Sequence, residues 1–480
     1  MGPRFFKNGT IVSFDKVTES IKVLHNASLL TSDDGIITAI TTQPETLVLP
    51  TDTEIIDVTD KIVCPGFVDT HRHTWMTAYR TLGSNIILAQ YFSWVSQMSK
   101  ARNSYSAEDI YVSALAGYAE ALNGGVTSIV EHAHHNWDHD VMMRGFDAAV
   151  DSGARIWWCY DIMATNESFS GGEQTKALLD LAVRHRSTRP DSAVAFGLAW
   201  DSLSFTPPDQ VEPTRAIIQS LKPEVITVHT VGPGPWGSGN SPTLAHSYAL
   251  LDSPNPPWIF SHGGFVTESD RAILRSTDNF ISITPESEMH YGHGQFSCCD
   301  IQDQAALGID TAFTFSGEIF TQARIWLQAE RARRYNAALK TAIPDRCPMT
   351  VEHAFLLATR HGGRAVRRDD IGVLTVGAKA DIVVFDGESP NMAGWTDPVA
   401  AVILHANVSD IRHVLVGGEW RKRDGQLILK EGQWEGLARR LKEVAIRVQE
   451  ENRTPPELPD NIWGNPLTTP EVVDIRRGKE

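Results

Sequence analysis

Eight short apolar runs alternate with helical patterns through the middle of the chain, and this alternation restricts the fold more than any other feature. The runs are residues 61–69, 126–131, 155–161, 193–199, 225–229, 258–262, 280–284 and 306–310. Apolar, β-branched strands separated by helices are typical of a parallel sheet covered by helices. Because eight such strands close a (β/α)8 barrel, we predict an α/β fold with a TIM barrel over residues 61–370.

One of the intervening helices has clear boundaries. Residues 106–109 read Ser-Ala-Glu-Asp, the pattern of a capping box, and apolar side chains then recur on one face as far as Leu122. Gly124 and Gly125 end the pattern. We therefore predict a helix between the first two strands of the barrel.

The two ends of the chain read as short strands with turns. Residues 1–60 contain β-rich runs with turn signals such as Asn8-Gly9, and a similar block returns over residues 371–430. We predict that both blocks assemble into one small β-sandwich domain. Residues 431–480 are expected to add a C-terminal helix and a proline-rich tail that lies over the surface from residue 455 on.

Composition narrows the classes of function. The chain has 480 residues, 42% hydrophobic and 21% charged, which is typical of a globular protein. The net charge of −16, without a long run of Lys or Arg, argues against nucleic acid as a partner. No stretch is long and apolar enough for a membrane span, and five cysteines without CxxC spacing suggest reduced thiols. We expect a cytoplasmic protein.

Four of the predicted strands end at residues that bind metals. The first runs into His71 and His73, and others end at His229, His262 and Asp310. His71 and His73 are two residues apart, so in an extended segment both imidazoles point the same way. Since barrel strands end at one face, we expect these side chains to converge there, whereas one strand-end histidine alone is more often structural. Imidazoles with a carboxylate suit one divalent metal, Zn²⁺ first, although Fe²⁺ or Mn²⁺ would also be accepted.

Several motifs resemble those of the amidohydrolase superfamily, in its cytosine deaminase and chlorohydrolase branch. They are PGFVDTHRHTW (65–75), NGGVTSIVEH (123–132), ITPESEMHYGHG (283–294), LGID (307–310) with GEIFTQAR (317–324), and GVLTVGAKADIVVFD (372–386). The resemblance covers roughly residues 1–430, and its first and last motifs are the most specific.

The resemblance implies a role for each strand-end residue. His71, His73, His229 and Asp310 would be metal ligands, and His262 would stabilise the attacking water and the developing oxyanion. Asp310 would also act as the general base that takes a proton from water. Binuclear members of the superfamily carry a lysine on the fourth strand, but residues 155–161 and 193–199 contain none, so a single metal is predicted.

One position departs from the pattern. Deaminases of this branch usually carry a Glu three residues after the histidine of the fifth strand, and here that residue is Gly232. Glu286 and Glu288 would replace this proton donor if they point inward. Alternatively, both are solvated loop carboxylates or partners of Arg324.

Other residues near the expected site are candidates for binding substrate. An apolar wall would form from residues directly after the two histidines, and loop histidines would approach the ligand. The candidates are Trp75, Met76, Tyr79, His134, His290 and His293. The aromatic residues could instead pack the barrel rim, and His132, His135 and His139 are as readily structural.

These features predict an enzyme that hydrolyses a carbon–nitrogen bond of a small cyclic molecule, by deamination or amide cleavage. Because Gly232 replaces the usual acid, a metal-assisted lyase, isomerase or cyclase is the alternative. A binding protein that has lost its chemistry is a third hypothesis, which the complete set of ligands argues against. The family often forms homodimers, so a homodimer is possible.

Overall fold

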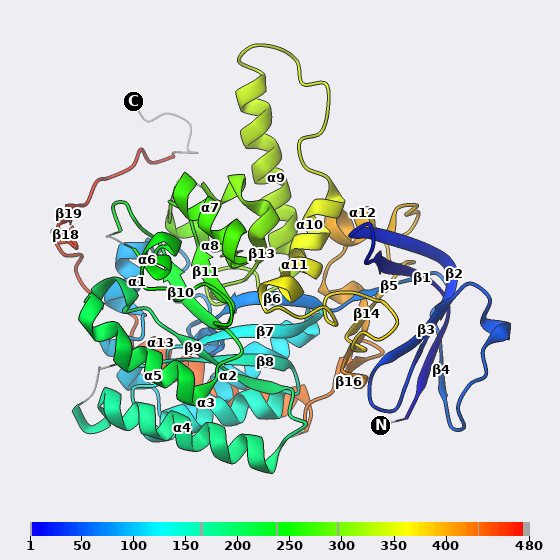
Figure 1. The fold of residues 1–480 in the computed structure, drawn as a ribbon, viewed down its shortest axis with the longest axis horizontal. Helices are drawn as coiled ribbons and strands as arrows, with labels where there is room; N and C mark the ends of the chain where they lie inside the picture. The colour runs from blue at the N-terminus through cyan, green and yellow to red at the C-terminus, as the bar shows by residue number, and fades with distance from the viewer. Residues whose placement is uncertain (1, 164–166, 237–238, 295–296, 431, 474–480) are drawn as a thin grey trace.

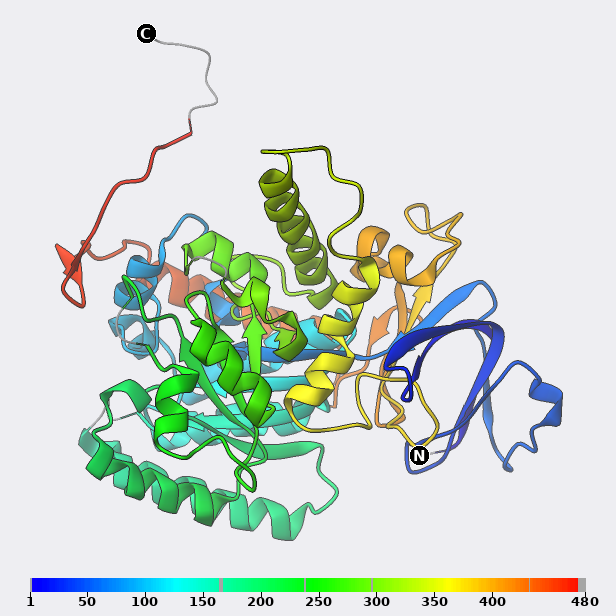
Figure 2. The ribbon, with the colours of Figure 1, turned by 45° about the horizontal axis from the view of Figure 1, so that its top comes forward.

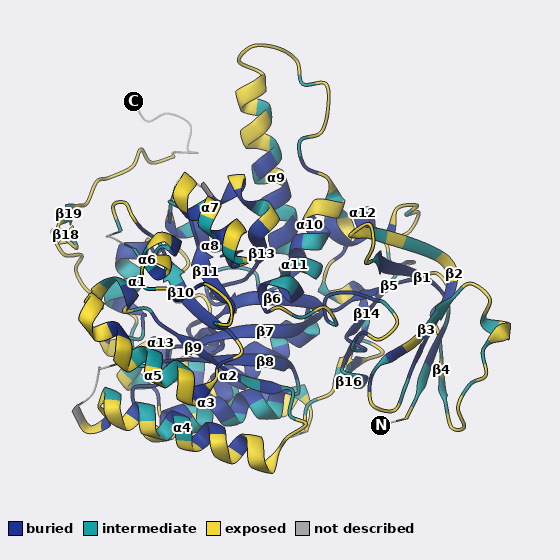
Figure 3. Cartoon of the chain, in the orientation of Figure 1, coloured by how far each residue is buried: buried dark blue, intermediate teal, exposed yellow. Residues whose placement is uncertain are grey.

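The barrel is built from eight parallel strands in chain order. The computed structural model describes residues 2–163, 167–236, 239–294, 297–430 and 432–473. The strands are β6 (Phe67–Arg72), β7 (Val126–Ala133), β8 (Arg155–Asp161), β9 (Val194–Ala199), β10 (Ile226–Thr230), β11 (Trp258–His262), β12 (Phe280–Ile283) and β13 (Ala305–Leu307). Their residues are almost all buried, as the dark blue strands in Figure 3 show. The prediction of a (β/α)8 barrel is confirmed.

Hydrogen bonds between the first and last strands close the barrel. The backbone N–H groups of Ile309 and Asp310 both donate to the carbonyl of His71, at 3.0 and 2.8 Å, and His73 N–H donates to the carbonyl of Asp310 at 2.8 Å. Gly308 permits this approach, since a Cβ there would lie 2.9 Å from the backbone nitrogen of His71. The last strand is shorter than the predicted run, because the chain turns at Asp310, whose φ is +70°.

Helices surround the strands (Figures 1 and 2). Along the chain they are α1 (Leu88–Trp94), α2 (Ala107–Asn123), α3 (His139–Ser152), α4 (Gly171–Thr188), α5 (Val211–Leu221), α6 (Pro242–Ser247), α7 (Glu268–Thr277), α8 (Pro285–Tyr291), α9 (Ile319–Ala338), α10 (Val351–Ala358) and α11 (Arg360–Ala365). The predicted helix is α2, and Ser106 caps it by accepting from the backbone N–H of Asp109, while the Asp109 carboxylate accepts from Ser106 N–H. Gly124 is its C-cap.

Strands from both ends of the chain join in a second sheet of nine strands. The N-terminal part provides β1 (Arg4–Asp15), β2 (Ser20–Thr31), β3 (Ile37–Thr41), β4 (Glu54–Asp57) and β5 (Lys61–Pro65). The C-terminal part provides β14 (Ile382–Asp386), β15 (Ile411–Val416), β16 (Glu419–Arg423) and β17 (Gln426–Leu427). Antiparallel pairing of β5 with β14 connects the two parts. The division into domains at residues 60, 370 and 430 stays a prediction.

The apolar run 61–69 is not one strand, as the sequence suggested, but parts of two. Residues 61–65 form β5 in the second sheet, and residues 67–72 form β6 in the barrel. The chain leaves one sheet for the other at Gly66, where a Cβ would lie 2.1 Å from Thr127 Oγ1. The apolar pattern continues across this point because both strands are buried, so periodicity alone does not reveal the break.

The C-terminal segment packs along the barrel and then follows its surface. After the short α12 (Pro398–Ala400), α13 (Trp434–Glu451) contacts α2, and the exposed chain beyond it contains a small hairpin, β18 (Asn461–Ile462) and β19 (Asn465–Pro466). Figure 1 shows this tail in red on the side that carries α1 and α6. Among the helices within the described residues, none has both the length and the apolar character needed to cross a membrane.

Candidate metal centre and active-site pocket

Four donor side chains meet where barrel strands end. His71 and His73 lie at the end of β6, His229 in β10, and Asp310 three residues after β13. Nε2 of His73 lies 3.1 Å from Nε2 of His229 and 3.2 Å from Oδ1 of Asp310, and Nε2 of His71 lies 3.7 Å from the same oxygen. Neighbouring ligands around a tetrahedral ion with 2.0–2.1 Å bonds lie about 3.3 Å apart. The spacing therefore fits one divalent metal.

Hydrogen bonds on the far side of each imidazole fix its orientation. Nδ1 of His73 donates to the carbonyl of His132 at 2.9 Å, and Nδ1 of His229 donates to Oδ2 of Asp201 at 2.7 Å. Nδ1 of His71 lies 2.8 Å from Oγ of Ser261. Such bonds at Nδ1 leave each Nε2 as the nitrogen that faces the metal.

The state of His71 also fits a metal ligand. Its side chain is fully buried, yet its Nε2 has no hydrogen-bond partner, which is costly for a buried polar atom. Burial lowers the pKa of His71 well below its ordinary value, so the imidazole is neutral, the form that binds a metal. The neutral imidazole with its unpartnered Nε2 thus suits a divalent cation.

Asp310 combines an ionised carboxylate with a strained backbone. Burial by itself would raise the pKa of Asp310, but the imidazoles of His71 and His73 beside its Oδ1 hold that pKa well below the ordinary value. Its other oxygen, Oδ2, accepts from Ser287 Oγ at 2.5 Å. A φ of +70° is rarely adopted by residues other than glycine, and such strain is concentrated at functional sites.

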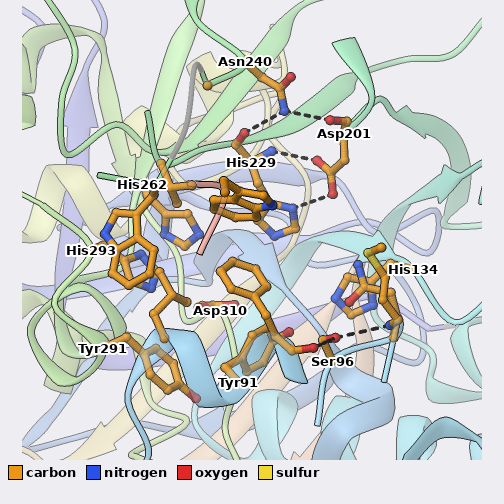
Figure 4. A pocket seen from close by; sticks show the side chains of 18 of the residues that line it. Tyr91, Ser96, His134, Asp201, His229, Asn240, His262, Tyr291, His293 and Asp310 are labelled. Atoms are coloured by element: carbon orange, nitrogen blue, oxygen red, sulfur yellow. Dashed lines mark hydrogen bonds and ion pairs between the residues drawn. The ribbon is translucent and has the colours of Figure 1, made fainter. Parts of the chain in front are cut away.

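His262 stands beside these donors at the end of β11. Its φ is +77°, and Nδ1 lies 2.8 Å from Oγ1 of Thr284, so Nε2 is left for a ligand. The centre of its ring lies 5.3 Å from that of His71. The strand-end residues chosen from the sequence thus lie in one place, and Figure 4 shows three of them, His229, His262 and Asp310.

A second donor group lies next to the first, and the sequence analysis did not single it out. His132, Asp161 and Asp201, from the ends of β7, β8 and β9, bring one donor atom each within 4.8 Å of one another. Oδ2 of Asp201 lies 3.2 Å from Nε2 of His132 and already accepts from His229. Asp201 follows its strand by two residues, so the strand-end rule that selected the histidines would also have selected it.

The structure does not bring Glu286 or Glu288 to the pocket. The carboxylate of Glu286 accepts from Ser316 N–H and from Nε2 of Gln322, and Glu288 accepts from the backbone N–H of Thr284 behind His262. Neither residue is among the described residues that line the cavity. The chain enters α8 directly after β12, which turns these side chains toward the protein, and a catalytic role for either of them stays a prediction.

Arg324 is not the partner of these carboxylates. Its guanidinium donates to the backbone carbonyls of Ile403 and Ala406, at 2.8 and 2.7 Å. The alternative that paired it with Glu286 or Glu288 is therefore wrong.

The residues predicted to bind substrate divide into two groups. His134 and His293 line the pocket, and His134 stacks on His73 with ring centres 3.9 Å apart. The others, which do not line it, are Trp75, Met76, Tyr79 and His290. The first three of these lie on a helical turn (Thr74–Tyr79) that directs them into the packing against α2, where they are fully buried. His290 instead packs against Tyr291 and Phe315.

A cavity of about 400 Å³ opens above the metal donors. Beyond those donors, its walls contain several aromatic side chains, which come from the loops and from short helices that follow the strands. They include Tyr91 and Phe92 on α1, Phe205, Trp236, Tyr291, and Trp463 of the C-terminal hairpin. The sequence offered no signal for these residues, because loop paths depend on tertiary packing.

Comparison with known proteins decides the family. A family model described as the amidohydrolase family matches residues 62–232 and 236–421, which is well over half of the chain. The chain belongs to the amidohydrolase family. The matched region contains all the metal donors, so the resemblance noted in the sequence is confirmed.

Curated relatives of this amidohydrolase are deaminases. A 5-methylthioadenosine/S-adenosylhomocysteine deaminase of Shouchella clausii is 21% identical over 441 residues, which cover 88% of this chain and 94% of the relative. A 5'-deoxyadenosine deaminase of Methanothermobacter thermautotrophicus is 23% identical and covers 78% of this chain and 86% of its own length.

Solved structures share the fold of this amidohydrolase. An adenosine deaminase from Xanthomonas campestris with bound zinc has a TM-score of 0.79 at 18% identity, and the match covers 93% of this chain and 98% of the other. An atrazine chlorohydrolase from Arthrobacter aurescens, a mutant complexed with zinc and atraton, has a TM-score of 0.76 at 17% identity, with 92% and 100% covered.

Proposed function

We propose that this amidohydrolase uses one zinc ion to hydrolyse a carbon–nitrogen bond of a small cyclic molecule, by deamination or amide cleavage. The observation that carries the proposal is the convergence of His71, His73, His229 and Asp310 around the unpartnered Nε2 of His71. Deaminases among the relatives, and zinc in similar structures, support it.

A single metal suits the side chains at the ends of β8 and β9. Neither strand contains a lysine that could bridge two ions. Asp201 occupies the adjacent space, but its carboxylate already accepts hydrogen bonds from the backbone and Nδ1 of His229. We assign Asp201 to the orientation of His229.

The protein side chains divide the remaining work. A divalent metal bound here supplies a Lewis acid, which lowers the pKa of water to about 7. The ionised Asp310 accepts the proton of the attacking water as general base. If Thr284 Oγ1 donates to Nδ1 of His262, the Nε2–H of His262 donates to the oxyanion that develops on the substrate.

The proton for the leaving nitrogen needs a carrier, because Gly232 stands where related deaminases have a Glu. Among the described residues that line the cavity, the carboxylates are Asp201 and Asp310. Asp201 is engaged by His229, so Asp310 returns the proton that it took from water.

Metal removal and a screen of substrates test this function. Purified protein would be analysed for zinc, treated with a chelator, and assayed for ammonia release from aminated heterocycles before and after zinc is restored. We expect activity to disappear with the metal and return with it, and His71→Ala to lack both metal and activity. Turnover that is indifferent to chelation, or intact in His71→Ala, would refute the proposal.

Gly232 specifically favours one alternative, a metal-assisted lyase, isomerase or cyclase, because such reactions do not need the missing acid. Turnover in ¹⁸O-labelled water separates the two functions: hydrolysis places the label in the product, and a rearrangement does not. A homodimer and a cytoplasmic location stay predictions.

A further inference from the structure

The cavity above the metal donors has an unusual chemical balance. Aromatic and apolar side chains make up much of its wall, together with polar ones such as Ser96, Gln97 and Ser204. None of the described lining residues is Lys or Arg. The two loops in which a few residues are not described cannot add one, since the sequence contains no Lys or Arg in 231–240 or 291–297. Among the described residues that line the pocket, an anionic substituent would therefore find no positively charged side chain to pair with.

The carboxylates of the pocket also disfavour an anionic ligand. Asp310 and Asp201 both line the cavity, and their carboxyl groups can offer an anion no positive partner. Burying an unpaired charge is costly.

The C-terminal hairpin supplies part of the outer wall. Trp463 lies at its tip and packs on Phe92 of α1, with ring centres 5.0 Å apart. Beside it, Asn465 Nδ2 donates to the carbonyl of Pro235 at 2.9 Å, in the loop after β10. A segment more than 200 residues away in the chain thus connects two walls of the cavity, and Figure 1 shows its hairpin, β18 and β19, on the side of α1 and α6.

The other end of this tail is also fixed. Where α13 ends, the carbonyl of Asn452 accepts from Trp94 Nε1 at 2.9 Å, and Asn452 Nδ2 donates to Ser104 Oγ at 2.8 Å. The exposed, proline-rich chain between residues 453 and 460 therefore spans two attached points. Proline limits its conformations, so the position of Trp463 is restricted even though few contacts hold the span.

Large apolar side chains remain exposed around the mouth of the cavity. The exposed fractions are 77% for Phe205, 72% for Met98 and 54% for Trp463, and all three line the cavity. Apolar surface that is concentrated at the mouth of a pocket marks a site for an apolar ligand. Packing against a ligand would bury this surface.

We infer that the pocket binds a flat, apolar ring molecule without an anionic group, and that Trp463 of the C-terminal hairpin is a specificity-determining residue that stacks on it. The role of this molecule as substrate rests on the proposed function, whereas its binding does not. Stacking on an indole requires only a π-face, so the rest of the molecule is selected by size and by the absence of negative charge.

A matched pair of fluorescent probes tests the charge preference. N-phenyl-1-naphthylamine is uncharged, and 8-anilino-1-naphthalenesulfonate has the same rings with one sulfonate added. Each would be titrated into the zinc-loaded, full-length protein. We expect one site per chain for the uncharged probe and about tenfold weaker binding of the sulfonate, roughly 1.4 kcal/mol. Equal or tighter binding of the sulfonate would overturn the inference.

Variants of the tail test the role of Trp463. Trp463→Ala should weaken binding of the uncharged probe about fivefold, and Trp463→Phe should retain most of it, because the ring is kept. Leu458→Ala is the matched control, since Leu458 is exposed on the same tail and does not line the cavity. The same loss in Leu458→Ala and Trp463→Ala, or no loss in either, would refute the role.

Unchanged circular dichroism and unfolding midpoints are expected for all three variants, because the replaced side chains are exposed. The binding readout involves no turnover, so a failure of the hydrolysis proposal leaves these results standing. Conversely, failure of the probe experiment leaves the ammonia assay unaffected.

Discussion

The carboxylate of Asp201 holds His229 by two hydrogen bonds. Oδ2 accepts from Nδ1 at 2.7 Å, and Oδ1 accepts from the backbone N–H at 2.9 Å. Nδ2 of Asn240 in turn donates to the backbone carbonyls of both residues, at 2.9 and 3.0 Å. The end of β9 and the end of β10 are thereby connected, and Nε2 of His229 faces His73 (Figure 4).

Asp201→Ala should therefore weaken zinc binding about 10- to 100-fold, the usual effect of removing a residue that orients a ligand. Asp201→Asn should lose less, because its amide oxygen can still accept from Nδ1. The dissociation constant would be measured by competition with a chelator. Asp209→Asn, an exposed carboxylate at the start of α5, is the control, and an equal effect there would contradict the assignment.

The ion pair of Asp69 and Arg72 should contribute strongly to stability. Both side chains are almost completely buried, with Arg72 Nη1 3.0 Å from Oδ2 of Asp69. Oδ1 of Asp69 also accepts from the backbone N–H groups of His71 and Ile309, which connects the two strands that close the barrel.

Asp69→Ala leaves the buried guanidinium with the carbonyl of Gly317 and the more distant carboxylate of Glu120, at 3.9 Å, so we expect a loss of about 3–5 kcal/mol in the free energy of unfolding. Denaturant titration checks this value. Lys176 and Asp180 form an exposed pair at 2.6 Å on α4, and Asp180→Ala should cost less than about 1 kcal/mol. Similar losses for the two variants would rule out the difference in burial as the cause.

The barrel could be predicted because its signal is local. Each strand is an apolar run, and the strand-end positions of His71, His229 and Asp310 follow once eight strands share one face. Asp161 ends the run 155–161 and Asp201 follows the run 193–199 by two residues, so the same rule applies to both carboxylates. The break at Gly66 was not accessible, since both strands around it are buried and equally apolar.

The walls of the pocket could not be derived from the sequence. Trp75 and Tyr79 follow the metal-binding histidines directly, yet the helical turn at Thr74–Tyr79 directs them into the core. Phe205 and Trp463 reach the cavity from a loop and from the chain terminus. Their positions depend on contacts between segments far apart in sequence, which no local pattern records.

Lys422 should make stability depend on pH in the alkaline range. Burial lowers the pKa of its ammonium group from 10.5 to about 8, while Nζ donates to the carbonyls of Asn123 and Val408. Between pH 8 and 10.5 the unfolded chain keeps this proton and the folded chain has lost it. The unfolded state then binds more protons, so stability rises with pH through this window.

Deprotonation of Lys422 should raise the free energy of unfolding by roughly 3 kcal/mol between pH 8 and 10.5. Tyrosines and cysteines also titrate there, so the quantity to measure is the difference between the wild type and Lys422→Met in denaturant titrations at pH 7.5 and 10.5. Lys16→Met, at an exposed position, is the control. A wild-type pH dependence that persists unchanged in Lys422→Met would contradict the prediction.

Ser287 should affect the chemical step without affecting metal binding. Its Oγ donates to Oδ2 of Asp310, the oxygen that does not face His71 and His73, and the Ser287 side chain is completely buried. The bond fixes the plane of the carboxylate and so directs the general base. Ser287→Ala removes it while leaving the metal-facing Oδ1 in place.

We expect Ser287→Ala to lower kcat about tenfold, with KM and zinc content close to those of the wild type. Ser276→Ala, which removes an exposed hydroxyl that donates only within α7, should change none of these quantities. Loss of zinc from Ser287→Ala would mean that the hydroxyl supports the ligand set as a whole. A lower kcat with full zinc occupancy would instead assign Ser287 to the positioning of Asp310 for proton transfer.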